Sequence, residues 1–403
     1  MRKWNVLFIT VFWLESAMAS SSIFGFGPNL IGTYQYQYSV AALGRGGYEM
    51  AYLDSMNLNQ MNFATWAYLS RTTVSFNVSY QGMNIQSQSG QSQFDAKANF
   101  NGGFIAWPLI KRNVTVGIGL SPQSVSDLGV QIQNVGIGAK GVQSVNSSGA
   151  ISEAKLIVAL ALGKNLSIAL VPSLSFGMIS DVIGIDFNDV AYNNVSIQNQ
   201  YQFTGFGLTG NAYLNLWDFM AFGAKIKIPS HLTVKTQQVS RVAYKPYDDV
   251  RSITLPFDIT IGGNMKLWGP WQIGGDIAYQ NWHNGYLLDN EALDNINDGF
   301  RIGVGIERSA SEEKKSVSYF KNINIRGGAF LSQLNSSSKG EKIHEYGLSF
   351  GLGLPIAMDQ NRIDMAFEFG QRGELDLNFL REMFFRFNLS ISANELWFVH
   401  QER

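Results

Sequence analysis

Apolar and polar residues alternate along this chain for about ten positions at a time, which is typical of strands that cross a membrane as a closed β-barrel. The clearest run covers residues 253–267. A helix does not have this period, because side chains reverse face at every residue only in a strand. The apolar residues predicted to share one face of this strand are Ile253, Leu255, Phe257, Ile259, Ile261, Met265 and Leu267.

Alternation bounded by polar, Gly or Pro residues predicts about fourteen antiparallel strands, an even number as bacterial barrels require. The predicted strands cover residues 72–80, 94–106, 114–120, 151–162, 166–178, 200–214, 219–228, 252–267, 271–282, 299–308, 322–331, 345–356, 362–370 and 382–391. A weaker run at 129–135 is predicted to lie in a loop. Short and long connections alternate, so the long ones, among them 121–150, 179–199 and 229–251, are expected outside the cell.

Residues 1–19 have the features of a secretory signal peptide. Arg2 and Lys3 precede a short apolar run, and Ala17 and Ala19 place small residues around a predicted cleavage site after Ala19. The apolar run is too short to cross a bilayer as a helix. We therefore expect an exported protein in the outer membrane of a Gram-negative-type bacterium.

Composition excludes several other classes of protein. Only 15% of residues are charged, the formal net charge is -1 and there is no Cys, so neither nucleic-acid binding nor a disulfide or thiolate metal site is expected. His231, His283 and His344 fall in separate predicted loops, and we expect no metal and no cofactor. The segment 347–351 matches a Gly-x-Ser-x-Gly pattern, but it continues a strand where that chemistry needs a strand-turn-helix. An enzyme is not expected.

The polar face of the predicted strands would line the barrel lumen. We expect these side chains to pair with one another and hold the barrel together rather than to contact a ligand. The residues predicted to face inward are Asp95, Lys97, Asn99, Lys155, Asp258, Lys266, Asp276, Arg301, Glu307, Arg326, Asp364, Glu368 and Arg386.

Residues 20–71 precede the first predicted strand and show no strand alternation. Tight turns at 25–28 and 44–47 and the apolar side chains of Leu53, Leu58 and Trp66 indicate a folded segment rather than a solvated tail. We expect this segment to fill the lumen as a plug, with residues 72–403 forming the barrel.

Two short blocks in this segment, Ala-Leu-Gly-Arg-Gly-Gly at 42–47 and Asn-Phe-Ala-Thr-Trp at 62–66, resemble the N-terminal hatch of the FadL/OmpP1/TodX family. Blocks at 276–282, 345–355 and 369–373 resemble shorter members of that family. The residues that carry the hatch resemblance are Gly44, Arg45, Gly46, Gly47, Asn62, Phe63 and Ala64. Phe63 stands where the family usually has Pro, so a backbone donor is restored and the dihedral angle is freed.

The resemblance implies an outer-membrane barrel plugged by a hatch, with an apolar ligand pocket near its outer face and a lateral gap in its wall. It also implies passive transport of hydrophobic small molecules such as long-chain fatty acids, which would be the ligand, with outer-membrane lipid as surroundings. It assigns no ligand-binding residues. Two alternatives share this fold: a barrel that binds a secreted protein partner, and a general porin with an open lumen.

Overall fold

The structure is a computed structural model that describes residues 22, 24, 30–133, 141–187, 193–217, 219–240, 247–293, 296–310, 319–338, 340–356 and 361–395. The predicted signal peptide, residues 1–19, lies outside the described residues. Among those described, no helix has the length and apolar character needed to cross a membrane.

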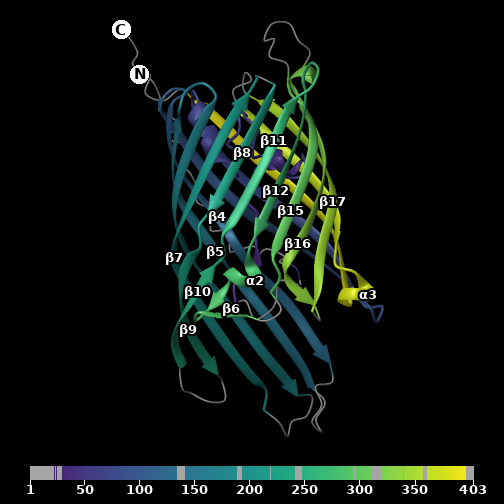
Figure 1. The fold of residues 1–403 in the computed structure, drawn as a ribbon. Helices are drawn as coiled ribbons and strands as arrows, with labels where there is room; N and C mark the ends of the chain where they lie inside the picture. Colours follow the sequence, from purple (N-terminus) through teal and green to yellow (C-terminus); the bar gives the residue numbers. More distant parts are fainter. Residues whose placement is uncertain are drawn as a thin grey trace, which may run out of the picture.

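The wall is a single antiparallel sheet that closes on itself, because β19 pairs with β2 (Figure 1). β8 and β9 both pair with β7 and together make one strand of the wall. β10 pairs with β9 and β11 pairs with β8, so these two elements together make the next strand. Counted in this way, fourteen strands close the barrel as predicted. The wall elements are β2 (Thr72–Ser87), β3 (Ser92–Ile110), β4 (Val114–Gln133), β5 (Gly141–Ala161), β6 (Leu166–Phe187), β7 (Val195–Leu216), β8 (Met220–Lys227), β9 (Ser230–Ser240), β10 (Tyr247–Leu255), β11 (Asp258–Lys266), β12 (Trp271–Gln280), β15 (Gly299–Arg308), β16 (Asn324–Ser338), β17 (Glu341–Ile356), β18 (Asn361–Arg372) and β19 (Leu380–Glu395).

Several strands extend well beyond their predicted ends, so the predicted long loops 121–150, 179–199 and 229–251 are partly wrong. β4 to β7 run far into these segments, and β9 lies wholly inside the last one. These extensions project beyond the rest of the barrel at the lower end of Figure 1. Their sequences are rich in Gln, Asn and Ser, as in Val-Gln-Ser-Val-Asn-Ser-Ser at 142–148. A sheet outside the lipid needs no apolar face, which removes the pattern that identifies a membrane strand.

The predicted strand 252–267 is interrupted, and its two parts point apolar side chains in opposite directions. Ile253 and Leu255 are buried inside the barrel, whereas Ile259 and Ile261 are exposed on the outer surface. The interruption lies at Pro256, which cannot donate a ladder hydrogen bond. The prediction of one continuous apolar face was therefore wrong, because the residues before this proline point into the barrel.

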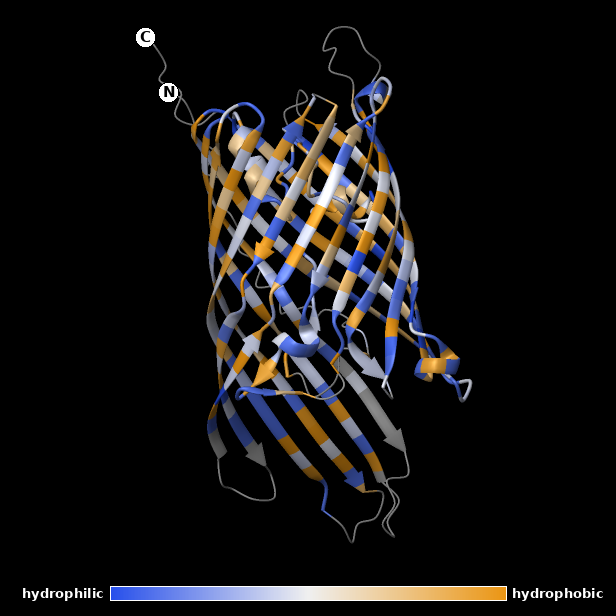
Figure 2. Cartoon of the chain, in the orientation of Figure 1, coloured by the Kyte–Doolittle hydropathy of each residue, from blue (hydrophilic) through white to orange (hydrophobic). Residues whose placement is uncertain are grey.

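The inner part of the barrel exposes apolar side chains on its outer surface, and Figure 2 shows apolar and polar residues alternating along its strands. Leu170, Ile277 and Leu348 on three separated strands are each more than half exposed. This is the arrangement expected where side chains contact acyl chains. Trp217 and Trp268 are exposed beside the short turns, whereas Trp282 is buried inside the barrel.

The N-terminal segment, which we define as residues 30–71, lies inside the barrel (Figure 1). It contains β1 (Thr33–Tyr34), α1 (Val40–Leu43) and the 3-10 helix η2 (Phe63–Tyr68). Ser39 caps α1 and Asn62 caps η2 through side-chain oxygens that accept backbone hydrogen bonds. α1 contacts β17 to β19, and η2 contacts β4 to β7 across the lumen.

The remaining short elements lie in connections between wall strands. They are α2 (Trp282–Gly285), β13 (Leu287–Leu288), β14 (Glu291–Ala292), η3 (Tyr319–Asn322) and α3 (Leu375–Asn378). β13 pairs with β10, and Ile296 forms a bridge with Ser336 near the end of β16. The described parts of this connection, residues 281–293 and 296–298, therefore lie between these two strands in the outer part of the barrel.

Most residues predicted to face the lumen are buried there, although Lys266 is exposed at the end of β11. Three of these residues and three further charged residues form a continuous series of ion pairs inside the barrel, which we call the ion-pair chain. Its members in order of contact are Arg45, Glu307, Arg326, Asp364, Arg362 and Asp54. Because Arg45 and Asp54 belong to the N-terminal segment, the chain ties that segment to β15, β16 and β18 and is neutral as a whole.

We predict that Arg326→Met lowers the free energy of unfolding by about 3 to 5 kcal/mol, because it leaves Glu307 and Asp364 with fewer partners in a dry interior. Arg326 lies 2.6 Å from Asp364, and both side chains are fully buried. The measurement is denaturant unfolding in lipid vesicles, followed by the change in gel mobility of the folded barrel.

The matched control is Arg251→Met. Arg251 also lies 2.7 Å from a carboxylate, that of Asp289, but the two side chains are 36% and 44% exposed. An exposed pair contributes about 1 kcal/mol or less. Equal losses in the two variants would show that the ion-pair chain does not hold the structure together.

Candidate functional site

The first block of the predicted hatch motif forms a tight turn directly after α1, pressed against the wall. Arg45 donates to Glu307 at 2.7 Å and stacks on Tyr52, with its guanidinium carbon 3.6 Å from the ring centre. The Gly46 amide donates to Ser349 on β17 at 2.8 Å. Arg45 therefore anchors the turn by charge, and Gly46 anchors it by a backbone hydrogen bond.

The glycines of this turn permit its close approach to the wall strands. A Cβ atom on Gly46 would lie 2.5 Å from the carbonyl oxygens of Ala329 and Val304, and Gly46 has a φ of +75°. A Cβ atom on Gly44 would lie 2.8 Å from the Cα atom of Gly351. Larger residues at these two positions would push the segment away from β15, β16 and β17.

The second block of the motif lies on the opposite side of the lumen. Asn62 donates to the carbonyl oxygens of Met50 at 2.7 Å and Ala212 at 2.8 Å. Ser167 on β6 donates to the carbonyl oxygen of Ala64 at 2.8 Å. These hydrogen bonds satisfy backbone groups that would otherwise be buried without partners.

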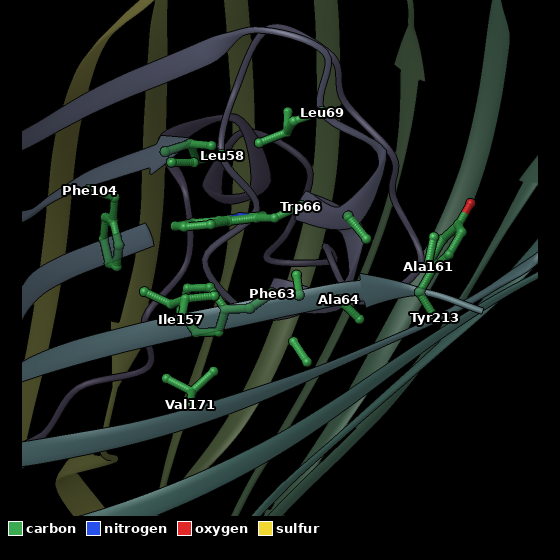
Figure 3. Close-up of a cluster of buried hydrophobic side chains, with 14 of the residues drawn as sticks. Leu58, Phe63, Ala64, Trp66, Leu69, Phe104, Ile157, Ala161, Val171 and Tyr213 are labelled. Carbon is green, nitrogen blue, oxygen red and sulfur yellow. The ribbon is translucent and has the colours of Figure 1, made fainter. Parts of the chain in front are cut away.

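Phe63 and Trp66 are the centre of an apolar cluster against the inner face of the wall (Figure 3). Their ring centres lie 5.1 Å apart in an edge-on arrangement, and Phe104 of β3 lies 6.2 Å from Trp66. The phenyl ring at the position usually held by Pro thus contributes apolar contact area here. The two blocks of the motif do not form one site, because they anchor opposite sides of the same segment.

Glu49 lies between these anchors and carries no ion pair among the described residues. Its backbone amide donates to Asp276 on β12 at 2.6 Å, and its carboxylate accepts from the Ser39 amide at 3.2 Å. Burial raises the pKa of Glu49 to about 7. Below neutral pH the carboxyl group is therefore mostly protonated and adds no charge to the lumen.

The wall is unpaired between β3 and β4 in its outer part. Their pairing runs from Ile110 with Val114 to Gly103 with Leu120. Among the described residues, β3 outward of Gly103 pairs only with β2, and β4 outward of Leu120 pairs with β5 and β1. The outer halves of β3 and β4 thus border a lateral gap, which the ion pair of Lys97 with Asp127 spans.

β1 occupies part of this gap as an added strand on the edge of β4. Thr33 pairs with Val125 and Tyr34 with Ser124, antiparallel, and the Gln35 amide donates to the Gln123 carbonyl at 2.9 Å. The N-terminal segment thereby supplies hydrogen bonds that β3 would supply in a fully paired wall.

A cavity of about 940 Å³ connects the lumen with this gap. On the inner side Tyr34, Tyr36, Tyr38 and Arg301 line it. On the outer side its lining includes Phe76, Phe100 and Leu120, which are 52%, 43% and 40% exposed on the lipid-facing surface. A cavity of this size accommodates a small organic ligand.

Comparison with known protein families identifies the family of this chain. A model of the family described as BamG matches residues 3–402. The chain belongs to the BamG family. A comparison with curated proteins gave no match by sequence.

Solved structures with the same fold include the P. putida toluene transporter TodX, with a TM-score of 0.59 and 13% identity over 91% of this chain and 100% of that one. The Ralstonia pickettii toluene transporter TbuX has a TM-score of 0.59 and 12% identity over 89% of this chain and 98% of that one. A Pseudomonas aeruginosa FadL homologue has a TM-score of 0.58 and 11% identity over 90% and 99%. The predicted FadL-type, outer-membrane barrel fold is confirmed.

Sequence reasoning did not identify the residues of the gap and its cavity. β1 is only two residues long, so it carries no alternation that could be recognised. Arg301 was predicted to face the lumen, but nothing in its sequence neighbourhood indicates a cavity. The Tyr-Gln-Tyr-Gln-Tyr repeat at 34–38 was the one available signal, because alternating aromatic side chains in an otherwise irregular segment indicate a special face.

We predict that Gly46→Ala displaces the N-terminal segment, because the added Cβ would overlap two wall carbonyl oxygens. Overpacking combined with a positive φ costs about 2 to 4 kcal/mol. The expected result is lower unfolding stability together with more frequent channel openings in planar bilayers. Gly90→Ala is the control, because Gly90 has a φ of +83° with no atom within 4 Å of its Cβ position. If Gly90→Ala matches Gly46→Ala in both measurements, the contact with the wall is unimportant.

Proposed function

We propose that this protein carries hydrophobic small molecules, long-chain fatty acids among them, passively across the outer membrane. The observation that carries the proposal is the lateral gap between β3 and β4, which joins the lumen cavity to the apolar outer surface. The structural neighbours TodX and TbuX, which share this fold, are toluene transporters.

A sideways exit suits a hydrophobic cargo physically. Each CH₂ group taken out of water contributes about 0.8 kcal/mol, so a cargo molecule is held in an apolar cavity and then passes into lipid without crossing a wet channel. Phe76, Phe100 and Leu120 offer such a surface where the cavity meets the gap. The transfer needs no energy source, because the molecule moves between apolar surroundings.

In this proposal residues 20–71 are the hatch, with Gly44, Arg45, Gly46, Gly47, Asn62, Phe63 and Ala64 fixing its inner part to the wall. Residues 72–403 are the transmembrane barrel. The part of the hatch that moves is β1, because it is held by a short ladder at the gap whereas the ion-pair chain holds the inner part. Displacement of β1 widens the passage from cavity to lipid.

A disulfide between positions 33 and 125 tests this movement. The chain has no Cys, and Thr33 pairs directly with Val125, so Thr33→Cys with Val125→Cys forms one defined crosslink. We expect the oxidised double variant to lose most uptake of radiolabelled oleate by intact cells that lack other such transporters, and a reductant to restore it.

The two single-cysteine variants are the controls, and in each of them uptake should be the same under oxidising and reducing conditions. Uptake at the normal rate by the crosslinked protein would show that β1 stays in place during transport.

Deletion of residues 20–71 tests the hatch itself. Without the segment the lumen loses the side chains that fill it, so we expect a larger ion conductance of single barrels in planar bilayers. An unchanged conductance would mean that these residues do not block the lumen.

A further inference from the structure

The short turns, which lie at the periplasmic end of such a barrel, carry an excess of positive charge. The whole chain, in contrast, has a formal net charge of only -1. Among the residues that the structure describes, the exposed charged side chains at this end are those of Lys111, Arg112, Lys164, Lys266, Lys321 and Glu395. None of the five cations forms an ion pair with a described residue. This end of the barrel therefore lacks counter-charges of its own.

Four of these cations lie on a row of turns along one side of the barrel end. We call Lys111, Arg112, Lys164 and Lys266 the basic rim. Backbone hydrogen bonds of 2.7 to 2.8 Å join each turn of the row to the next, from the Ala161 amide to the Asn113 carbonyl, from Asn215 to Asn165 and from Lys266 to Phe219. Like charges on neighbouring turns repel one another, and a bound anion removes this repulsion.

Apolar side chains are exposed directly beside the basic rim. Leu109 and Ile110 are consecutive residues, yet they are 66% and 55% exposed, because the register between β3 and β4 shifts at this point. Leu162, two residues before Lys164, is also exposed. A membrane phospholipid presents matching groups in the same order, because its acyl chains lie in the bilayer and its phosphate lies at the edge.

The tips of two turns in this row have a backbone conformation that their residues rarely adopt. Arg112 has a φ of +56° and Trp217 a φ of +51°, where Gly or Asn is usual. Such a conformation costs free energy, so stability alone would favour a smaller residue at both positions. Both side chains are exposed. Trp and Arg are residue types that interact favourably with the head-group layer of a membrane, so their presence indicates a contact with that layer.

We propose that the basic rim binds the phosphate groups of anionic phospholipids in the periplasmic leaflet, with their acyl chains against Leu109, Ile110 and Leu162. An acidic soluble protein would match the charges but would leave these apolar side chains without a partner. The rim lies at the opposite end of the barrel from the gap, so this inference does not depend on the proposed transport function.

The test is native mass spectrometry of the purified full-length protein in a non-ionic detergent. The probes are equal amounts of dioleoylphosphatidylglycerol and dioleoylphosphatidylcholine, which have the same acyl chains but differ in net charge. We expect the unmodified protein to retain mainly phosphatidylglycerol. The double variant Lys111→Gln with Lys164→Gln should lower the ratio of the two retained lipids about tenfold, because two of the cations that attract the phosphate are lost.

Lys235→Gln with Lys342→Gln is the matched control, because it also removes two exposed lysines, but from the outer part of β9 and β17. It should leave the lipid ratio unchanged. All four lysines are exposed, so both double variants should fold, which the gel mobility of the barrel checks.

A second measurement needs no variant. Raising the salt concentration should lower the preference of the unmodified protein for phosphatidylglycerol, because salt screens exposed charges.

Three results would overturn the proposal. The first is an equal loss of preference in the two double variants, which would mean that only the total charge matters. The second is a preference that salt does not change. The third is equal retention of both lipids by the unmodified protein, which would favour an acidic protein as the partner of the basic rim.

Discussion

A strand in a bilayer must have its backbone polar groups paired, because lipid offers no hydrogen bonds. The barrel meets this requirement around its whole inner circumference, where every wall strand pairs with two neighbours. Among the described residues, one departure lies outward of Gly103 and Leu120, where β3 and β4 separate. The N-terminal segment covers part of this opening from inside. The position of β1 therefore follows from the break in the wall, because β1 pairs with the free edge of β4.

The N-terminal segment is held to the wall by many contacts near the short turns and by few contacts near the gap. Toward the short turns, the ion-pair chain, the glycine turn at 44–47 and the apolar cluster around Trp66 hold it to both sides of the lumen. Toward the gap, β1 adds only a two-residue ladder on β4. A segment fixed at one end and weakly held at the other is suited to local movement, because the cost of releasing β1 does not include the buried charges.

The sequence predicts the parts of the fold that contact lipid, since alternation is required there. β15 was predicted with its observed ends, and the two blocks that resemble the family hatch contact the wall. The extensions of β4 to β7 were missed, because segments rich in Gln, Asn and Ser have little apolar period. All of β9 was missed too, because its apolar face toward the lumen consists of little more than Leu232 and Val234. The proline at 256 was visible, but the reversal of side-chain direction that it causes depends on the neighbouring strands.

The candidate site could be predicted only in part for a similar reason. Lumen-facing charges follow from alternation, but which of these charges contact one another depends on the register of strands far apart in the chain. Arg301 pairs across to Ala278 and Ser332, neither of which is acidic, whereas Glu307 on the same strand lies opposite Arg326. Register between β15 and β16 cannot be read from either strand alone.

Amide hydrogen exchange of the lipid-embedded protein is the most direct measurement of the open wall. We expect amides of β3 outward of Gly103 that face β4 to exchange much faster than amides of residues 103–106 on the same strand, which are paired on both sides. Amides of β4 at the positions paired with β1 should be intermediate. Uniform slow exchange along the whole of β3 and β4 would contradict a gap between them.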